Sequence, residues 1–477
     1  MRRCLSRAGS RRRNERAGRF LTGSTLGHVV RMTATGALGI TFVFVVDAAN
    51  LLWVSQLGDR QLVAAIGFAY AVQFFSVSIA VGLMIAATAV VSRSIGAGDR
   101  DKARRQAGAA VVIAACTLAV VSALIVLFRQ QLVGWAGAEG ETARLAARYL
   151  AISIPSLVPM SAALVMSGTL RADGYGAKAM YVTLLAGVVL LIIDPFLIYY
   201  SGWGLDGVAV GLVLFRFALL ALAVRFAIIE MNLIDRPRLS TLRNIGAPFV
   251  AVAIPAIATQ MSTPVGNYLL TRVMAPYGDD AVAAWAVVGR LTVVVFGGIF
   301  ALSGAIGGIF GQNFGAGQME RVRSTYRDAL VFCLIYTLVA WGLFVLLVPY
   351  IIAAFDLSGQ GADVLNAFAV IGVGGFIFFG ALFVSNAAFN NLGKPGRSTL
   401  VNWTKDGVLS LPAALWFAGI FGAAGVIYGQ AAAGIVVGAV SATWGWFYVK
   451  GLRPVDAVAL DPAAPAPYPN PDRHRSR

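Results

Sequence analysis

Histidine and cysteine are almost absent from this sequence. The two histidines, His28 and His474, lie near opposite ends of the 477 residues, which excludes a histidine-based metal cluster or proton relay. The three cysteines, Cys4, Cys116 and Cys333, are widely separated and form no Cys-x-x-Cys motif, so we interpret them as small packing residues. No Ser-His-Asp or cofactor-binding pattern occurs either. We therefore predict that the protein is not an enzyme and carries no cofactor and no metal.

Charge is also scarce. Charged residues make up 13% of the chain and hydrophobic residues 58%, whereas a soluble domain is about one quarter charged. Apolar runs of the roughly 20 residues that cross a bilayer recur along the chain, without the alternation of a membrane β-barrel. We predict an all-α polytopic membrane protein with twelve transmembrane helices. The expected spans are 29–56, 62–92, 107–130, 144–170, 178–200, 205–231, 248–276, 281–311, 326–354, 362–391, 398–420 and 421–449.

The spans divide into two groups of six around the polar stretch IDRPRLSTLRNIG. We expect a basic cytoplasmic tail over residues 1–28, an N-lobe over 29–233, a cytoplasmic linker over 234–247, a C-lobe over 248–452 and a disordered tail over 453–477.

The basic residues fall almost entirely in alternate loops, which predicts an integral plasma-membrane protein with both termini in the cytoplasm; the membrane we expect is a bacterial inner membrane. Residues 1–31 hold nine Arg against Glu15 alone. No aromatic interleaving accompanies this charge, so we expect no nucleic-acid binding. We interpret the stretch as an orientation signal near anionic headgroups, with a transit peptide as the weaker alternative.

One short phrase occurs twice. Residues 94–105 read SIGAGDRDKARR and residues 313–324 read NFGAGQMERVRS, an offset of 219 that also relates VAA at 63–65 to VAA at 282–284. The shared offset indicates that the molecule is one unit built twice. The phrase lacks the pattern of a phosphate-binding loop. Its glycines act either as a hinge or as an ordinary helix stop.

Two acidic residues lie deep in apolar spans. Asp47 belongs to the first span and Asp194 to the fifth, and a carboxylate near the bilayer centre costs about 2.5–3.5 kcal/mol, so such residues are usually functional. Pro195 should kink the helix beside Asp194. Asn50 lies on the same helical face as Asp47 and is placed to donate a hydrogen bond to it. We predict that both carboxylates exchange protons; the alternative is that each serves only a helix–helix hydrogen bond.

The second half carries no matching acid. The 219-residue offset maps Asp47 onto Gly266. Asp406 adjoins Lys405, which favours an ion pair or an interfacial position over an ion-coupling role. We predict that Gln260 and Asn267 line a central cavity. Aromatic side chains near Asp47 offer cation–π surface to a cation, and those expected at the cavity are Phe42, Phe68, Tyr70 and Phe74. The alternative for each of them is packing in the core or against lipid.

Together these segments resemble the multidrug and toxic compound extrusion (MATE) family. The resemblance is carried by VVDAANLLWVSQLGDRQLVAAIGFA (45–69), SRSIGAGDRDKAR (92–104), SGTLRADG (167–174), IIDPF (192–196) and GQNFGAGQMERVR (311–323). It implies two six-helix lobes related by a pseudo-two-fold axis, whose central cavity opens alternately to either side. It also implies export of organic cations or other amphipathic small molecules, driven by inward flow of H⁺ or Na⁺.

The position of the acids is similar to that in the DinF-like prokaryotic branch, which implies that Asp47 and Asp194 are the coupling residues. In that branch an Asn usually precedes the second acid by four residues and a Thr lies on the sixth helix; here these positions are Leu190 and Leu212. A sodium ion wants several oxygen ligands, so we expect coupling to H⁺, with Na⁺ as the alternative. We expect a monomer.

The main rival function is a flippase for lipids or lipid-linked precursors with a similar two-lobed architecture. It requires a cationic cavity, for which only Arg216, Arg272 and Arg290 are available in or near the spans.

Overall fold

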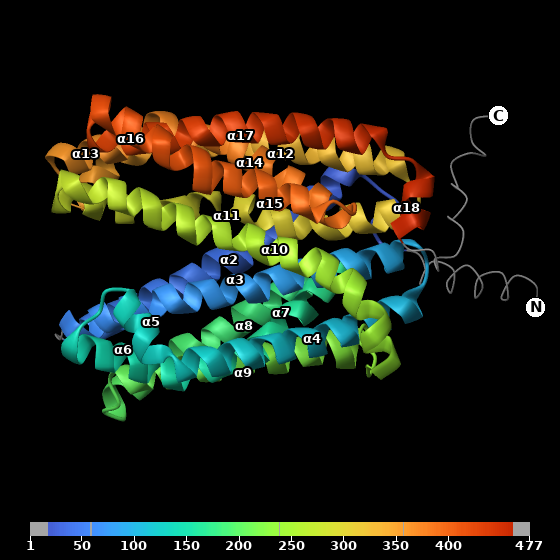
Figure 1. Ribbon diagram of the computed structural model, residues 1–477, viewed down its shortest axis with the longest axis horizontal. Coiled ribbons are helices and arrows are strands. Elements are labelled where there is room, and N and C mark those ends of the chain that lie inside the picture. The colour runs from blue at the N-terminus through green and yellow to red at the C-terminus, as the bar shows by residue number, and fades with distance from the viewer. Residues whose placement is uncertain (1–17, 58–59, 238, 356, 461–477) are drawn as a thin grey trace, which may run out of the picture.

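A computed structural model describes residues 18–57, 60–237, 239–355 and 357–460. Figure 1 shows two stacked helical bundles, one from each half of the chain, with the start of α2 and the helix α18 at the same end of the molecule. The first half contains α2 (Thr25–Ser55), α3 (Arg60–Gly96), α4 (Arg100–Leu127), α5 (Arg129–Trp135), α6 (Gly140–Ser153), η1 (Ile154–Ser156), α7 (Leu157–Ala172), α8 (Gly176–Pro195), η2 (Phe196–Tyr200), α9 (Leu205–Val224) and η3 (Arg225–Glu230).

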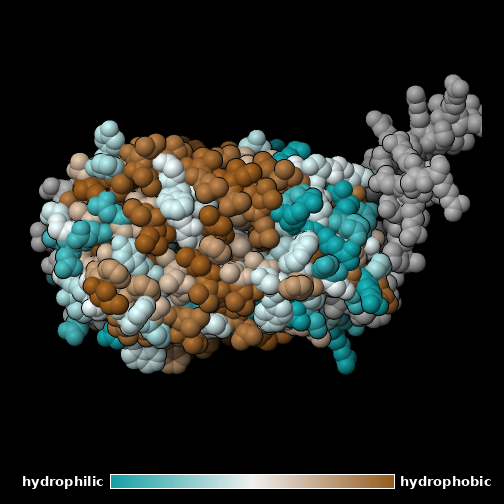
Figure 2. All heavy atoms as spheres, turned by 90° about the horizontal axis from the view of Figure 1, so that it is seen from above, coloured by the Kyte–Doolittle hydropathy of each residue, from teal (hydrophilic) through white to brown (hydrophobic). Residues whose placement is uncertain are grey.

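The second half repeats this plan. It contains α10 (Leu239–Met274), η4 (Ala275–Tyr277), α11 (Asp279–Gly315), α12 (Met319–Ala354), α13 (Gly359–Ala367), η5 (Phe368–Gly372), α14 (Val373–Asn391), α15 (Pro395–Trp403), η6 (Thr404–Leu409), α16 (Ser410–Phe421), α17 (Ala423–Gly451) and α18 (Pro454–Leu460). Hydrophobic residues cover the middle of the face in Figure 2, and hydrophilic residues gather toward both ends of the molecule. This distribution suits a protein whose middle lies in lipid.

In the described ranges, 11 helical segments are long and apolar enough to cross a membrane. The expected span at 398–420 is helical as well, but it is divided into α15, the π-helical η6 and α16. Lys405 and Asp406 lie in η6 and lower the hydropathy of this segment. A π turn inside a helix is often found at a functional site.

The lobe boundaries differ from the expected ones in two places. Helix α10 begins at Leu239, inside the expected linker, and α18 lies within the expected disordered tail. The remainder of that tail, 461–477, and the first 17 residues lie outside the described residues.

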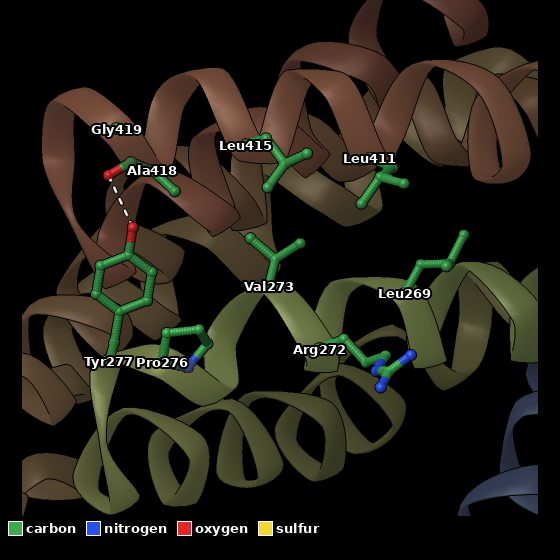
Figure 3. Close-up of a pocket in the computed structure, with 9 residues that line it drawn as sticks. All are labelled: Leu269, Arg272, Val273, Pro276, Tyr277, Leu411, Leu415, Ala418 and Gly419. Atoms are coloured by element: carbon green, nitrogen blue, oxygen red, sulfur yellow. Dashed lines mark hydrogen bonds between the residues drawn. The ribbon is translucent and has the colours of Figure 1, made fainter.

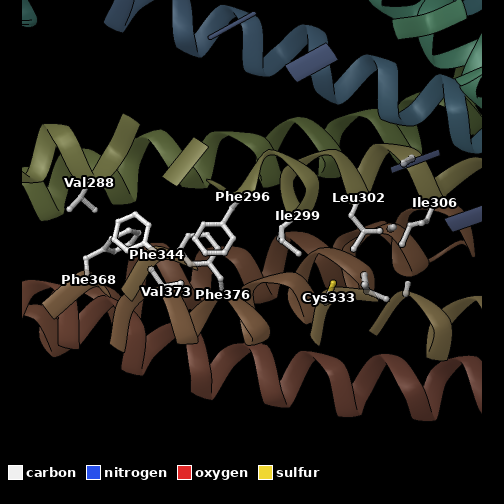
Figure 4. Close-up of a cluster of buried hydrophobic side chains, with 14 of the residues drawn as sticks. Val288, Phe296, Ile299, Leu302, Ile306, Cys333, Phe344, Phe368, Val373 and Phe376 are labelled. Atoms are coloured by element: carbon white, nitrogen blue, oxygen red, sulfur yellow. The ribbon is translucent and has the colours of Figure 1, made fainter. Parts of the chain in front are cut away.

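Each lobe has its own apolar core, and the first helix of each lobe begins in the core of the other. Val29 and Met32 of α2 belong to the C-lobe core, while Phe249 and Val252 of α10 belong to the N-lobe core. In the C-lobe, Phe296 stacks on Phe376 with ring centroids 3.8 Å apart (Figure 4). The expected packing role is confirmed for Cys333, which is 1% exposed in this core; Cys116 is exposed.

The first glycine of each repeated phrase packs against the backbone of the other lobe. A Cβ atom at Gly96 would lie 2.0 Å from the Gln312 carbonyl oxygen, and one at Gly315 would lie 2.1 Å from the Arg93 carbonyl oxygen. The 219-residue offset maps Arg93 onto Gln312 and Gly96 onto Gly315, so the two contacts are pseudo-symmetric copies of one another. Only glycine permits backbones to approach this closely. The repeated phrase thus builds the seam between the lobes at the end that carries the chain termini.

The lobes separate toward the opposite end. On α3, a Cβ at Gly82 would meet Ile257 of the other lobe, whereas one at Gly67 would have no atom within 4 Å. On α11, a Cβ at Gly297 would meet Thr41, whereas one at Gly289 is equally free. Between these two positions α11 bends at Phe296, whose φ of −106° and ψ of 16° are not helical. The close glycine contacts between the lobes therefore lie toward the end that carries residues 18–24 and α18.

Part of the expected tail closes this seam. Phe20 is 3% exposed, and its backbone N–H donates to Gln312 Oε1 at 3.0 Å while its carbonyl accepts from Arg321 Nη2 at 2.7 Å. The preceding residue, Arg19, donates to the Tyr175 hydroxyl of the N-lobe at 2.7 Å. Residues 18–24 therefore bridge both lobes instead of forming a free tail.

A buried ion pair fixes the N-lobe loops beside this bridge. Arg100 donates through both terminal nitrogens to the Asp173 carboxylate, each at 3.1 Å. Burial raises the pKa of Asp173, and the Arg100 guanidinium opposes that shift.

Candidate functional site

Asp47 lies on the side of α2 that faces the C-lobe. It follows Gly36, whose Cβ would meet Ala301 of α11 at 3.0 Å, by about three helical turns on the same face. Because α11 bends away beyond Gly297, Asp47 is left exposed. A carboxylate that is exposed in this position is available to a ligand between the lobes.

Asp194 is in the opposite situation. It is 0% exposed, and neither carboxylate oxygen has a hydrogen-bond partner among the described residues. Asn50 faces it, without a hydrogen bond of ordinary geometry, and the Asn50 amide oxygen is likewise unpartnered there. The sequence placed Asn50 beside Asp47, but its side chain is directed at the acid on the neighbouring helix.

The wall behind Asp194 is apolar. Leu190, one turn before it on α8, is 2% exposed, and Gly211 of α9 presents its backbone to the carboxylate. A buried polar group without a partner raises the free energy of the folded protein. Binding of a proton or another cation to this carboxylate would lower that free energy. This environment suits a carboxyl group that exchanges a small cation.

Replacing Gly211 by Ala should disturb this acid directly. The new methyl group would lie 1.8 Å from Asp194 Oδ1, so the carboxyl group or α9 must move, and overpacking of this kind costs about 1–3 kcal/mol. We expect a lower melting temperature and clearly slower transport in vesicles. Gly304→Ala is the matched control, because a Cβ there has no atom within 4 Å. Unchanged melting and transport for Gly211→Ala would contradict the packing described here.

Pro195 ends the regular part of α8. The α-helical hydrogen bonds give way immediately after it to the π turn η2, Phe196–Tyr200. The sequence predicted a kink at this point, and the structure has a widened turn next to the acid.

Arg216 is a buried cation of the N-lobe to which the sequence alone assigned no role beside Asp47. It is 2% exposed and donates to the Ser153 carbonyl, the Ser156 hydroxyl and the Gln73 side-chain oxygen at 2.9, 3.0 and 2.9 Å. Its charge acts on Asp47. In the sequence, a lone arginine inside an apolar span was the sign that this residue has a role. Its partners could not be predicted, because they belong to helices far away in the sequence.

The expected ion pair in the C-lobe is confirmed. Lys405 Nζ lies 2.5 Å from Asp406 Oδ1, and Ser262 donates to Asp406 Oδ2 at 2.9 Å. Asp406 is buried, and it packs against Gly266, the repeat counterpart of Asp47. Asp406 is therefore already paired with a cation of the chain itself, whereas the Asp194 carboxylate has no hydrogen-bond partner among the described residues.

The expected cavity residues lie in different surroundings. Tyr70 is 49% exposed, stacks on Phe74 with centroids 6.0 Å apart and interacts electrostatically with Asp47. Asn267 is exposed, and Gln260 and Phe68 are half-buried. Phe42 instead packs on α8, where its ring would lie 2.6 Å from a Cβ at Gly187. Asp47, Tyr70 and Phe74 therefore form one surface, and Phe42 is part of the N-lobe packing.

Comparison with known proteins places this arrangement among transporters. The MatE family model matches residues 37–196 and 255–416, one segment in each lobe. The chain is 25% identical over 419 residues to an FAD transporter of Shewanella oneidensis, covering 85% of this chain and 91% of the relative. It is also 25% identical to a probable multidrug resistance protein NorM of Thermotoga maritima, covering 69% and 72%. A multidrug resistance MATE family transporter solved in an outward-facing conformation superimposes with a TM-score of 0.85 at 21% identity, covering 91% of this chain and 98% of that chain.

Proposed function

Because the chain belongs to the MatE family of membrane transporters, we propose that it exports organic cations in exchange for protons by alternating access. The observation that carries the proposal is the pair of acids in one lobe only. Asp47 is exposed between the lobes beside two stacked aromatic rings, and Asp194 is buried without a hydrogen-bond partner among the described residues. The first suits a cationic cargo, and the second suits a proton.

The charges of Asp47, Asp194 and Arg216 explain why cargo and proton exclude each other. Two ionised carboxylates, Asp47 and Asp194, and the Arg216 guanidinium together carry one negative charge, which attracts a monovalent cation. One proton taken up by either acid makes this set of three groups neutral and releases the cargo. The protein moves the two ligands in opposite directions because they compete for the same charge.

Protons fit this site better than sodium ions. A sodium ion needs several oxygen ligands, but neither Asp194 oxygen has a hydrogen-bond partner among the described residues, and the groups recorded beside it include the apolar Leu190 and the Gly211 backbone. A proton needs only one carboxylate oxygen. Each proton that moves inward through about 100 mV supplies roughly 2.3 kcal/mol to export.

The lobe contacts support the alternating-access part of the proposal. The glycine seam and residues 18–24 join the lobes near the chain termini, which the basic loops place in the cytoplasm. In the opposite half, Asp47 and Tyr70 are exposed. We interpret this arrangement as a state that is closed to the cytoplasm and open to the outside. We propose that the protein lies in the plasma membrane and works as a monomer.

Inverted membrane vesicles give the direct test. With an acidic interior, vesicles that contain the protein should accumulate a fluorescent organic cation, and a protonophore should abolish the accumulation. A sodium gradient alone should have no effect, and vesicles without the protein provide the background. Accumulation driven by sodium alone would make H⁺ coupling wrong, and no accumulation under either gradient would make cation export wrong.

A second candidate function is export of an anionic flavin dinucleotide, which the similarity to the FAD transporter over 91% of that relative suggests. Against it, Arg216 is 2% exposed and both of its terminal nitrogens donate to neighbours. The same vesicles distinguish the two, because FAD would accumulate while the cation would not.

The rival flippase function needs Arg216, Arg272 and Arg290 in one cavity. Arg216 is enclosed by N-lobe residues, and Arg272 and Arg290 are exposed on C-lobe helices. Movement of a labelled lipid between leaflets without cation transport would favour that rival.

A further inference from the structure

A groove runs between α10 and α16 in the C-lobe, separate from the site above. It has a volume of about 510 Å³ and is lined by Leu269, Arg272, Val273, Pro276, Tyr277, Leu411, Leu415, Ala418 and Gly419. Figure 3 shows the apolar side chains of the two helices facing each other along its length. The Tyr277 hydroxyl donates to the Ala418 carbonyl at 3.0 Å and bridges the two helices at one end of the groove (Figure 3).

The groove opens away from the protein core. Leu270 and Met274, which belong to the C-lobe core, are 2% and 0% exposed, and they point to the opposite side of α10 from Leu269 and Arg272. Leu415 is 56% exposed, and its neighbour Trp416 is 65% exposed. In a membrane-spanning helix, apolar residues that are exposed in this way contact lipid.

Arg272 is the only charged residue among those that line the groove. It is exposed, and across the described residues no ion pair includes it; its one recorded partner is the Tyr268 ring, 5.7 Å from the guanidinium carbon. Arg272 lies in the last turn of α10, and α10 ends at the end of the molecule opposite to α18 (Figure 1). This position is near the headgroup level of the corresponding leaflet.

We propose that this groove binds one anionic phospholipid, with the phosphate on Arg272 and an acyl chain along Leu269, Leu411 and Leu415. The charges match, because an unpaired guanidinium at headgroup level is complementary to a lipid phosphate. The chain direction matches as well, because Leu269 and Leu411 lie deeper along their helices than Arg272 and Ala418. An apolar groove with a single cation at its rim has the chemistry of a lipid, and it lacks the acid that an organic cation would require.

Native mass spectrometry of the full chain in detergent tests the site. Titration with dioleoyl phosphatidylglycerol should give one tightly bound lipid, and phosphatidylcholine should bind more weakly. Arg272→Gln should weaken phosphatidylglycerol binding roughly tenfold, the effect of losing one charge-assisted contact, and Arg272→Lys should retain part of it. Arg290→Gln is the matched control, because this exposed arginine does not line the groove.

A second variant tests the apolar half of the site without changing its charge. A Cβ at Gly419 has no atom within 4 Å, so Gly419→Phe should fill the groove without disturbing the fold and should reduce the binding of both lipids. Full phosphatidylglycerol binding by Arg272→Gln or by Gly419→Phe would overturn the proposal. So would a protein dimer that both variants dissociate, since it would identify a second copy as the occupant. Neither result depends on what the transporter exports.

Discussion

Asp194→Asn should abolish proton-driven accumulation of an organic cation while the protein remains folded. The amide has the same shape as the carboxyl group, so it fits beside Gly211, but it cannot take up a proton. We expect transport to fall by about 100-fold or more, the effect of removing an essential proton-transfer group. Thermal stability should stay the same or increase, because the variant removes a buried acid that has no hydrogen-bond partner in the described part of the chain.

This combination of lost transport and retained stability is what separates a coupling residue from a structural one. Asp206→Asn is the control: it removes a carboxylate of the same lobe that pairs with Arg148 at the surface, and surface pairs contribute about 0–1 kcal/mol. Transport by that variant should be close to wild type. Wild-type accumulation by Asp194→Asn would exclude Asp194 from the coupling mechanism, and a large fall in melting temperature would assign it a structural role.

The sequence was sufficient for the features that depend on one helix at a time. Apolar length predicted the spans, and the cost of a charge in lipid identified Asp47 and Asp194. The 219-residue offset predicted the repeat, and it also locates the pseudo-symmetric contacts of Gly96 and Gly315. The sequence left open whether these glycines are a hinge or a helix stop. The structure adds a third role, because Gly96 and Gly315 let the backbones of the two lobes come into contact.

Features that depend on neighbouring helices could not be predicted in this way. Asn50 lies on the same face of α2 as Asp47, yet its side chain is directed at an acid on α8. Arg216 receives its partners from α3, α6 and η1, which helical periodicity does not bring together. The tail was expected to be free because it is basic, but Phe20 is an apolar residue with a place in the C-lobe core.

Gly96→Ala should force the lobes apart at the cytoplasmic seam. The new methyl group would lie 2.0 Å from the Gln312 carbonyl oxygen, and a backbone atom cannot move aside as a side chain can. Overpacking costs about 1–3 kcal/mol, and each 1.4 kcal/mol changes a population ratio about tenfold. We therefore expect the equilibrium to shift by roughly one to two orders of magnitude toward the cytoplasm-open state, and net transport to fall because the outward-open state is depleted.

The distance between spin labels at Asp101 and Glu320 measures this shift. Both positions are exposed, one within each copy of the repeated phrase, and the labels would be introduced as cysteines after the natural cysteines are replaced. The distance should increase in Gly96→Ala and in its repeat counterpart Gly315→Ala. Gly67→Ala on α3 and Gly304→Ala on α11 are matched controls, since a Cβ at either position has no atom within 4 Å. If all four variants keep the wild-type distance, the glycine contacts do not hold the cytoplasmic side closed, and alternating access in this protein must depend on another contact between the lobes.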